Sequence, residues 1–381
     1  MKNVGTEDRV ARPPARDADR LARVRKAFAD TWFWCGIALV ASAIALLELI
    51  DPFFFCQDDA LVLELPGALQ ACRGLWSGLP ATYNPFTFLG DPTHALGTFY
   101  PPLHVAYAFA RFILRDEHAT FEVLAALHLL AGYVLTFLAA RRMGVGRAFA
   151  VLAGTTFVLS GPVLVMTRCW NSFGAAAAFV PLFALLTDRL RIGPVRCGWS
   201  VVTGLSMGLY YHAGFPQLFV LGTGLMLVHA IALGAFGVLP WRRLRWFLPA
   251  LAFGAAISLP VFYQQWRLAR ELSGDSSGGG EGVGNNLMAI FLPYPLAHGS
   301  LPNGWGNVNL AWGGHFYYFG TLLLVAFVAV MATPIWTWVT RTARKGTTTP
   351  VPATCRLELA LSIPAIVAFL MALGESGGCG G

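Results

Sequence analysis

Apolar residues come in blocks of about twenty along most of the chain, and polar or charged residues fill the intervals between the blocks. A helix of about twenty apolar residues crosses the ~30 Å hydrocarbon core of a bilayer. The pattern therefore predicts nine membrane-spanning helices. They are expected at residues 31–50, 118–140, 148–167, 173–188, 198–213, 215–236, 246–264, 314–338 and 357–374. Spans 173–188, 198–213 and 357–374 are short or interrupted by Gly or Pro, which is typical of helices that stop partway and line a cavity.

The composition supports the same class. Hydrophobic residues make up 56% of the 381 residues and charged residues only 12%, whereas soluble domains carry about 25% charged residues. We therefore expect an all-α polytopic membrane protein instead of about two soluble domains. The net charge of +7 would suit a nucleic-acid partner. The arginines, however, stand at the ends of the apolar blocks, where they set topology, and no nucleic-acid-binding motif is present.

The positive-inside rule decides the topology. Residues 1–30 form a basic tail that lacks the cleavage pattern of a signal peptide, so the tail is expected in the cytoplasm. The segment 101–114 is too short for an ordinary span and begins with two prolines. If it does not cross, 21 Lys and Arg lie inside and six outside; if it crosses, the split is 12 to 14. The first arrangement is favoured. It makes 101–114 a juxtamembrane or re-entrant helix.

This topology divides the chain into a cytoplasmic tail (1–30), a transmembrane domain (31–374) and a short end (375–381). The domain includes two long extracytoplasmic loops, at 51–117 and 265–313, and the second contains a Gly/Ser-rich linker. The seven cysteines show no metal-binding spacing. Cys56 and Cys72 share the first loop and could form a disulfide there, although isolated, reduced cysteines are favoured.

The first loop carries most of the candidate chemistry. Asp58 and Asp59 follow the first span by eight and nine residues and are flanked by Phe53, Phe54, Phe55 and Leu61. A carboxylate held beside an apolar wall can have a raised pKa and act as a general base. The alternative is that these acids are only solvated. Asp91, His94 and His104 follow in the same loop.

The loop also resembles a known family. Residues 78–92 fit G-L-P-x-x-x-N-P-[FY]-x-F-x-G-x-P, residues 99–102 read F-Y-P-P, and residues 213–217 read A-G-F-P-Q. Tyr318-Phe319-Gly320 precedes another apolar run. In this order, over about residues 30–330, the motifs resemble bacterial membrane proteins of the YfhO type, which belong to the GT-C superfamily of glycosyltransferases. The resemblance implies a GT-C-type helical bundle in the bacterial inner membrane, with a cytoplasmic N-terminus and juxtamembrane helices in the first outer loop.

The resemblance also implies an activity, which is inverting transfer of a sugar from a polyprenyl-phosphate carrier to an acceptor on the extracytoplasmic face. The acceptor would be a cell-envelope glycan, a lipid or a protein. Asp59 is the first candidate for the catalytic base, since its spacing to Pro66 matches the family's D-x6-P, and Asp58 is the second. The leaving phosphate needs a cation, for which the candidates are Arg168, then Arg73 and Arg267. Each arginine would otherwise be an interfacial anchor.

Other residues are candidates for substrate contact, but each also has an ordinary structural interpretation. They are Asp91, His94, His104 and Tyr100. Tyr100 would stack on a sugar ring, although aromatic residues also populate the membrane interface by default. Participation of a divalent metal is left open.

Two other function classes are considered beside the transferase. A transporter or flippase for a lipid-linked glycan would be expected to show intramembrane charges and repeated halves. The spans hold only Glu48, Glu122 and a few histidines, with no convincing repeat. The third possibility is a non-catalytic membrane partner subunit. It gains weight because the family pattern continues beyond the point where this chain stops, which predicts a truncated member.

Overall fold

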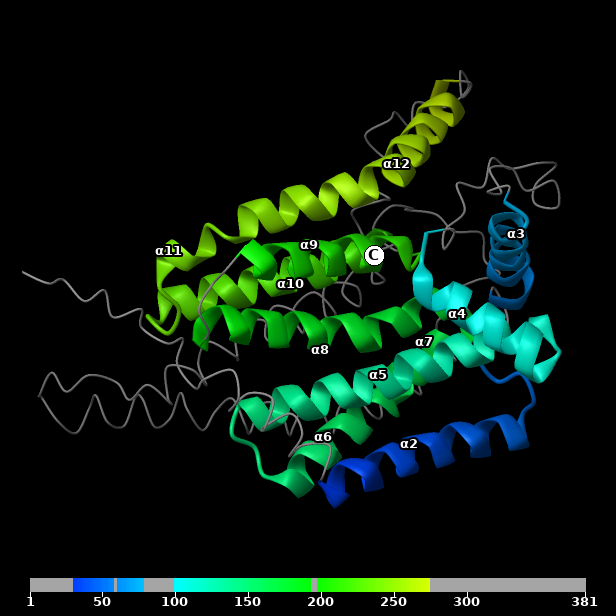
Figure 1. Ribbon diagram of the computed structural model, residues 1–381, viewed down its shortest axis with the longest axis horizontal. Coiled ribbons are helices and arrows are strands. Elements are labelled where there is room, and N and C mark those ends of the chain that lie inside the picture. The colour runs from blue at the N-terminus through cyan, green and yellow to red at the C-terminus, as the bar shows by residue number, and fades with distance from the viewer. Residues whose placement is uncertain (1–29, 58–59, 79–98, 193–196, 215, 275–381) are drawn as a thin grey trace, which may run out of the picture.

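A computed structural model describes residues 30–57, 60–78, 99–192, 197–214 and 216–274 (Figure 1). Every regular element in these ranges is a helix. Long helices run side by side, and shorter helices lie at both ends of the resulting bundle. The part of the chain that the structure describes therefore has the all-helical architecture expected from the sequence.

The helices that pass through the bundle run in both directions, with α6 and α7 following each other through it. They are α2 (Thr31–Ile50), α5 (Thr120–Arg142), α6 (Arg147–Val158), α7 (Gly161–Cys169), α8 (Asn171–Ile192), α9 (Cys197–His212), α10 (Pro216–Ala235) and α12 (Phe247–Gly274). The remaining elements connect them. These are η1 (Ala60–Glu64), α3 (Leu65–Trp76), α4 (Pro101–Phe109), η2 (Ala110–Leu114), η3 (Glu117–Ala119) and α11 (Trp241–Leu244).

Within the described ranges, five helical stretches are long and apolar enough to cross a membrane. They are Thr31–Ile50, Glu117–Arg142, Arg147–Cys169, Asn171–Ile192 and Trp241–Tyr263. Helix α9 has 16 residues and rises about 24 Å, in keeping with the short span expected there. Helix α10 has 20 residues and lies within the span expected at 215–236. The two expected spans at 314–338 and 357–374 lie outside the described residues.

Two stretches differ from the sequence-based expectation. The span expected at 148–167 consists of α6 and α7, which are separated at Leu159 and Ser160. Pro162 stands in the first turn of α7, and its missing N–H and steric bulk favour a new helix start at that point. Helix α8 extends beyond the expected span 173–188 at both ends, and Asp188 near its end is buried and forms ion pairs with Arg142 and Arg191.

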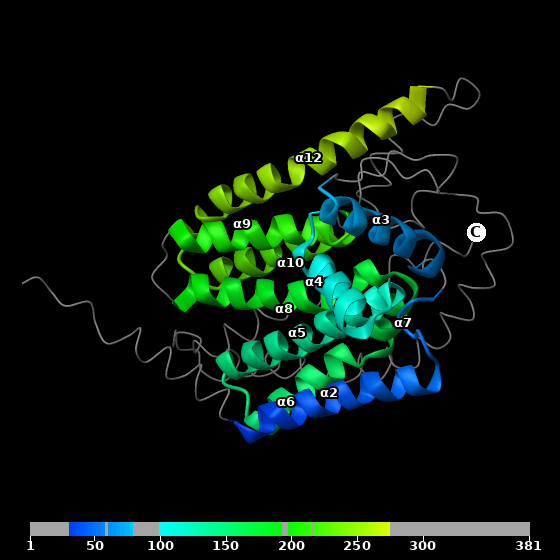
Figure 2. The same cartoon turned by 45° about the vertical axis from the view of Figure 1, so that its right-hand side comes forward.

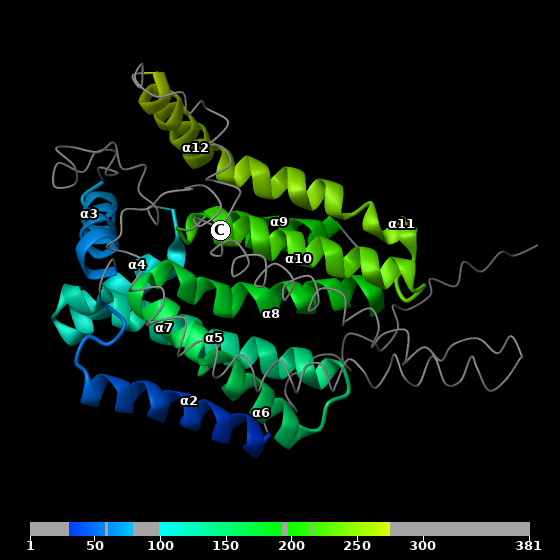
Figure 3. The ribbon, with the colours of Figure 1, turned by 180° about the vertical axis from the view of Figure 1, so that it is seen from behind.

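Small residues allow the helices to approach closely, as is common in membrane bundles. A Cβ atom added to Gly132 of α5 would lie 2.5 Å from the carbonyl oxygen of Ala177 in α8. One added to Gly204 of α9 would lie 2.6 Å from the carbonyl oxygen of Ala250 in α12. Helix α2 packs against α5 and α6, and α12 packs against α9. Figures 1 and 3 accordingly show α2 and α12 at opposite sides of the bundle.

The bundle has two chemically different ends. At the arginine-rich end, α5 and α8 finish and α6 and α9 begin. Ion pairs join Arg147 to Asp30 at 3.1 Å and Arg142 to Asp188 at 3.2 Å there. At the loop end, α2 and α7 finish and α5 and α8 begin, beside α3 and α4 (Figure 2). The segment 101–114 stays at the loop end, since η2 leads directly through η3 into α5.

Candidate functional site at the loop end

The turn that follows α2 is fastened to the bundle by two carboxylates. The backbone N–H of Phe53 donates to Glu48 Oε2 at 3.2 Å, and the N–H of Phe55 donates to Glu122 Oε2 at 3.1 Å. Phe53 has a φ of 62°, a left-handed conformation that is unfavourable for a bulky residue. Such backbone strain persists only where surrounding contacts hold it. The turn is therefore held in a defined conformation.

The same turn is tied to α7 at its far side. The N–H of Gln57 donates to the carbonyl oxygen of Arg168 at 3.2 Å. Beyond the next two residues, Glu64 in η1 accepts hydrogen bonds from Ser172 at the start of α8, with an Oε1–Oγ distance of 2.8 Å. The segments on both sides of Asp58 and Asp59 are therefore anchored to the ends of α7 and α8. Asp58 and Asp59 themselves lie outside the described residues.

Arg168, the first candidate for the phosphate-binding cation, lies at the end of α7. Its Nη2 is 2.9 Å from Asp51 Oδ2, and its guanidinium lies 4.8 Å from the ring centre of Phe54. The side chain is 33% exposed. Because a guanidinium has five N–H donors, the contact with Asp51 fixes the group and leaves it room to bind an anion. Arg168 also joins the ends of α2 and α7, as an anchoring residue would.

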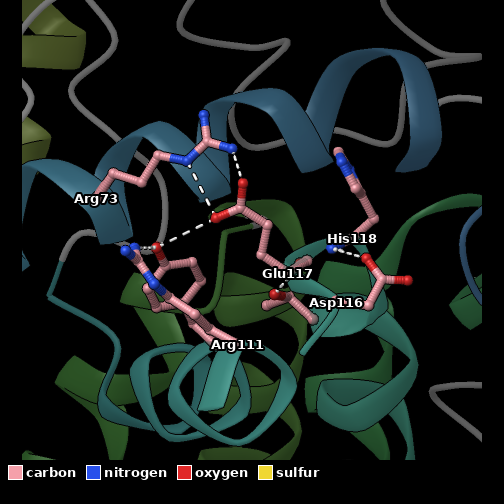
Figure 4. A network of polar contacts seen from close by, with 7 residues as sticks. Arg73, Arg111, Asp116, Glu117 and His118 are labelled. Carbon is pink, nitrogen blue, oxygen red and sulfur yellow. Dashed lines mark hydrogen bonds and ion pairs between the residues drawn. The ribbon is translucent and has the colours of Figure 1, made fainter. Parts of the chain in front are cut away.

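Arg73, the second candidate cation, belongs to a separate network. Its guanidinium forms a two-pronged pair with Glu117, and Figure 4 shows this carboxylate between Arg73 and the Tyr107–Arg111 pair. The hydrogen bond with Glu117 raises the pKa of Arg73. The network fastens α3 to the start of α5. Arg73 is 51% exposed, so its partner, and not burial, determines its orientation.

Tyr100 lies inside the bundle. It is 2% exposed, and its hydroxyl group is 2.6 Å from Nε2 of His128 in α5. Burial raises the pKa of Tyr100, so the hydroxyl group remains protonated. The contact fixes the start of α4 on α5, and the ring is not displayed to solvent for stacking. His104 is partly buried on α4.

The remaining sequence candidates are not described. Asp91 and His94 lie outside the described residues, and so does the side chain of Arg267, whose backbone belongs to α12. The structure therefore brings Arg168 to the anchored turn and puts Arg73 and Tyr100 in separate contacts. Glu48, Glu122 and Glu64 hold the turn and η1 in place, and none of them was given a role in the sequence analysis. A signal was present for two of them, since Glu48 and Glu122 are acids within apolar spans at the border of the loop.

The two cysteines of the first loop are free and buried. Burial, together with the negative charges of Glu122, Glu64 and Glu48, raises the pKa of Cys56 to about 12. Burial alone raises the pKa of Cys72 to about 12. Both groups remain neutral thiols at physiological pH and are poor nucleophiles. They belong to the core that packs η1 and α3 onto the bundle.

The loop end thus offers carboxylates and the partly exposed guanidinium of Arg168 on a fixed frame. Among the described residues, no group of three or more His, Cys, Asp or Glu side chains is arranged to hold a metal ion. No protein-family model, no curated protein and no solved structure matches the chain.

Proposed function

We propose that the chain is a membrane glycosyltransferase of the GT-C type, which transfers a sugar from a polyprenyl-phosphate carrier to an acceptor outside the cytoplasm. In this proposal nine helices span the bacterial inner membrane, the arginine-rich end faces the cytoplasm, and the loop end faces outward. The motifs in the first loop supply the reaction class. The structure of the loop end supplies one supporting observation.

That observation is the connection between Arg168 and the segment that carries Asp58 and Asp59. Gln57, the residue before Asp58, donates its N–H to the carbonyl oxygen of Arg168. Asp51 in the same turn pairs with the Arg168 guanidinium. An inverting transferase needs a base and a phosphate-binding cation on opposite sides of one anomeric carbon. These two contacts join parts of the chain more than a hundred residues apart, and they support a shared site for Arg168 and the segment that leads to Asp58.

In the proposed reaction, the carboxylate of Asp59 accepts the proton of the acceptor hydroxyl group while that oxygen attacks the anomeric carbon. The bond between the anomeric carbon and the phosphate oxygen breaks, and the polyprenyl phosphate departs with the electron pair. The guanidinium of Arg168 offsets the charge that develops on the phosphate. Attack opposite to the leaving group inverts the anomeric configuration.

The contacts of Glu48 and Glu122 favour this proposal over a transporter. Carboxylates within spans commonly mark an ion or substrate pathway. Here each of the two accepts a hydrogen bond from the backbone of the turn after α2. Their position is accounted for by holding that turn, which is the turn that leads to Asp58.

The test is donor consumption by the purified full chain in liposomes that contain a polyprenyl-phosphate sugar labelled in the sugar. We expect release of polyprenyl phosphate and transfer of the label to an acceptor fraction from the cell envelope. An Asp58→Asn, Asp59→Asn double variant is the matched control and should leave the donor intact. Equal donor consumption by both proteins would refute the proposal. Movement of intact donor between leaflets without cleavage would establish the transporter instead.

A further inference from the structure

The arginine-rich end carries a large excess of positive charge. It holds eight arginines and two acids, which are Arg141, Arg142, Arg147, Arg189, Arg191, Arg242, Arg243 and Arg245, with Asp30 and Asp188. The described part of the loop end, including the last turns of α12, has six arginines and seven acids. The bundle is therefore strongly polarised along its length. Six of the eight arginines at the arginine-rich end are exposed, and Arg191 and Arg243 are partly buried.

Internal contacts fix the position of this charge without neutralising it. Buried Asp188 pairs with Arg142 at 3.2 Å and with Arg191 at 2.7 Å. Asp30 pairs with Arg147. Arg243 donates from Nη1 to the carbonyl oxygens of Leu190 and Arg191, at 2.8 and 2.7 Å, at the end of α8. Two carboxylates thus serve three arginines, and a fourth arginine caps a helix, so a net positive charge remains on a rigid frame.

Exposed apolar side chains surround the arginines. Trp241 is 58% exposed, Phe149 69%, Ile192 56% and Leu248 69%. In the segment 241–246 the order is Trp-Arg-Arg-Leu-Arg-Trp, and the guanidinium of Arg245 lies 5.8 Å from the ring centre of Trp246. Aromatic residues beside arginines are typical of the level at which lipid headgroups meet acyl chains. A soluble acidic partner would leave these apolar side chains in water.

We propose that the arginine-rich end binds the phosphate headgroups of anionic phospholipids. The centre of this binding site is α11 (Trp241–Leu244) and the following Arg245. Arg242 and Arg245 are both exposed there. Guanidinium groups bind phosphate oxygens through paired hydrogen bonds. Trp241 and Leu248 enter the apolar region beside the bound headgroup. The site is independent of the transferase activity and lies at the opposite end of the bundle from the loop end.

The experiment is a lipid titration of the detergent-purified full chain, followed by native mass spectrometry, with phosphatidylglycerol, phosphatidylcholine and glycerol 3-phosphate as separate probes. Phosphatidylglycerol should bind the wild-type chain most tightly. Each basic residue near an anionic surface contributes about fivefold in affinity, so an Arg242→Gln, Arg245→Gln variant should lose about 30-fold for phosphatidylglycerol. Its affinity for phosphatidylcholine should be unchanged.

Two further variants make the result specific. Arg242→Lys, Arg245→Lys retains the charge and should bind phosphatidylglycerol within a few-fold of wild type. Arg111→Gln, Arg115→Gln removes the same charge from the loop end and should bind like wild type. A loss as large in the loop-end variant, or no loss in the Arg242, Arg245 variant, would overturn the proposal. Glycerol 3-phosphate binding as tight as that of the lipid would also overturn it, because the site would then recognise a soluble phosphate.

Discussion

The hydroxyl group of Tyr100 lies 2.6 Å from Nε2 of His128, and both side chains are buried, at 2% and 4% exposure. Tyr100 belongs to the F-Y-P-P motif that begins α4, whereas His128 lies within α5. The other ring nitrogen of His128 has no hydrogen-bond partner among the described residues. Among the described residues, the imidazole ring of His128 is therefore hydrogen-bonded through Tyr100, and this contact joins the first loop to the bundle.

The first prediction concerns this anchor. Tyr100→Phe should lower the free energy of unfolding by about 1–3 kcal/mol, since Nε2 of His128 would be left unpaired in the interior. Unfolding in mixed micelles measures the change. A double-mutant cycle with His128→Phe should give a coupling energy of at least about 0.5 kcal/mol. Additive effects of the two substitutions would contradict a direct bond between the side chains.

The helices could be predicted from the long apolar blocks. In hydrocarbon, the backbone N–H and C=O groups must form hydrogen bonds within the protein, and a helix satisfies them within one segment. The expected bounds of α2 agree with the structure and those of α5 differ by two residues at each end. The contacts between side chains could not be predicted from the sequence in the same way. Arg168 pairs with Asp51, 117 residues away, and no local pattern encodes that distance. For the same reason the burial of Tyr100 could not be predicted, since its partner lies on another helix.

The second prediction concerns thiol reactivity. With a pKa of about 12, Cys56 carries a thiolate in roughly one molecule in ten thousand at pH 8. N-ethylmaleimide should therefore modify exposed Cys197 well before Cys56, as peptide mapping would show. The rate at Cys56 should rise about tenfold per pH unit. Equal rates at Cys56 and Cys197 at neutral pH would contradict this.

The third prediction concerns orientation in the membrane. In a cysteine-free background, single cysteines at Arg141 and Arg243 should be protected from a membrane-impermeant maleimide in intact cells. Cysteines at Arg115 and Pro216 should react. The charge split of the sequence is the reason, since Lys and Arg collect in cytoplasmic loops. Positions 59 and 280 should react, and positions 191 and 344 should be protected. Labelling at position 141 from outside would exclude the nine-span topology.

The fourth prediction separates the two roles of Arg168. Arg168→Ala should raise KM for the polyprenyl-phosphate donor more than it lowers kcat, because its proposed task is to hold the phosphate. Asp51→Asn breaks the same ion pair but retains the guanidinium, so KM should change much less. Steady-state kinetics of both variants give the comparison. Equal effects of the two substitutions would assign Arg168 to anchoring α2 and α7 only.

The last prediction tests the base. Asp59→Asn should lower kcat by about 10²–10⁴-fold, because the amide retains the shape of the side chain but cannot accept the acceptor's proton. Donor binding and folding should be nearly unchanged, since the flanking contacts of Gln57 and Glu64 do not involve this carboxylate. Asp58→Asn is the neighbouring control and should be milder. The reverse ranking would move the base by one residue. Activity of both single variants within a few-fold of wild type would remove these acids from the mechanism and the transferase proposal with them.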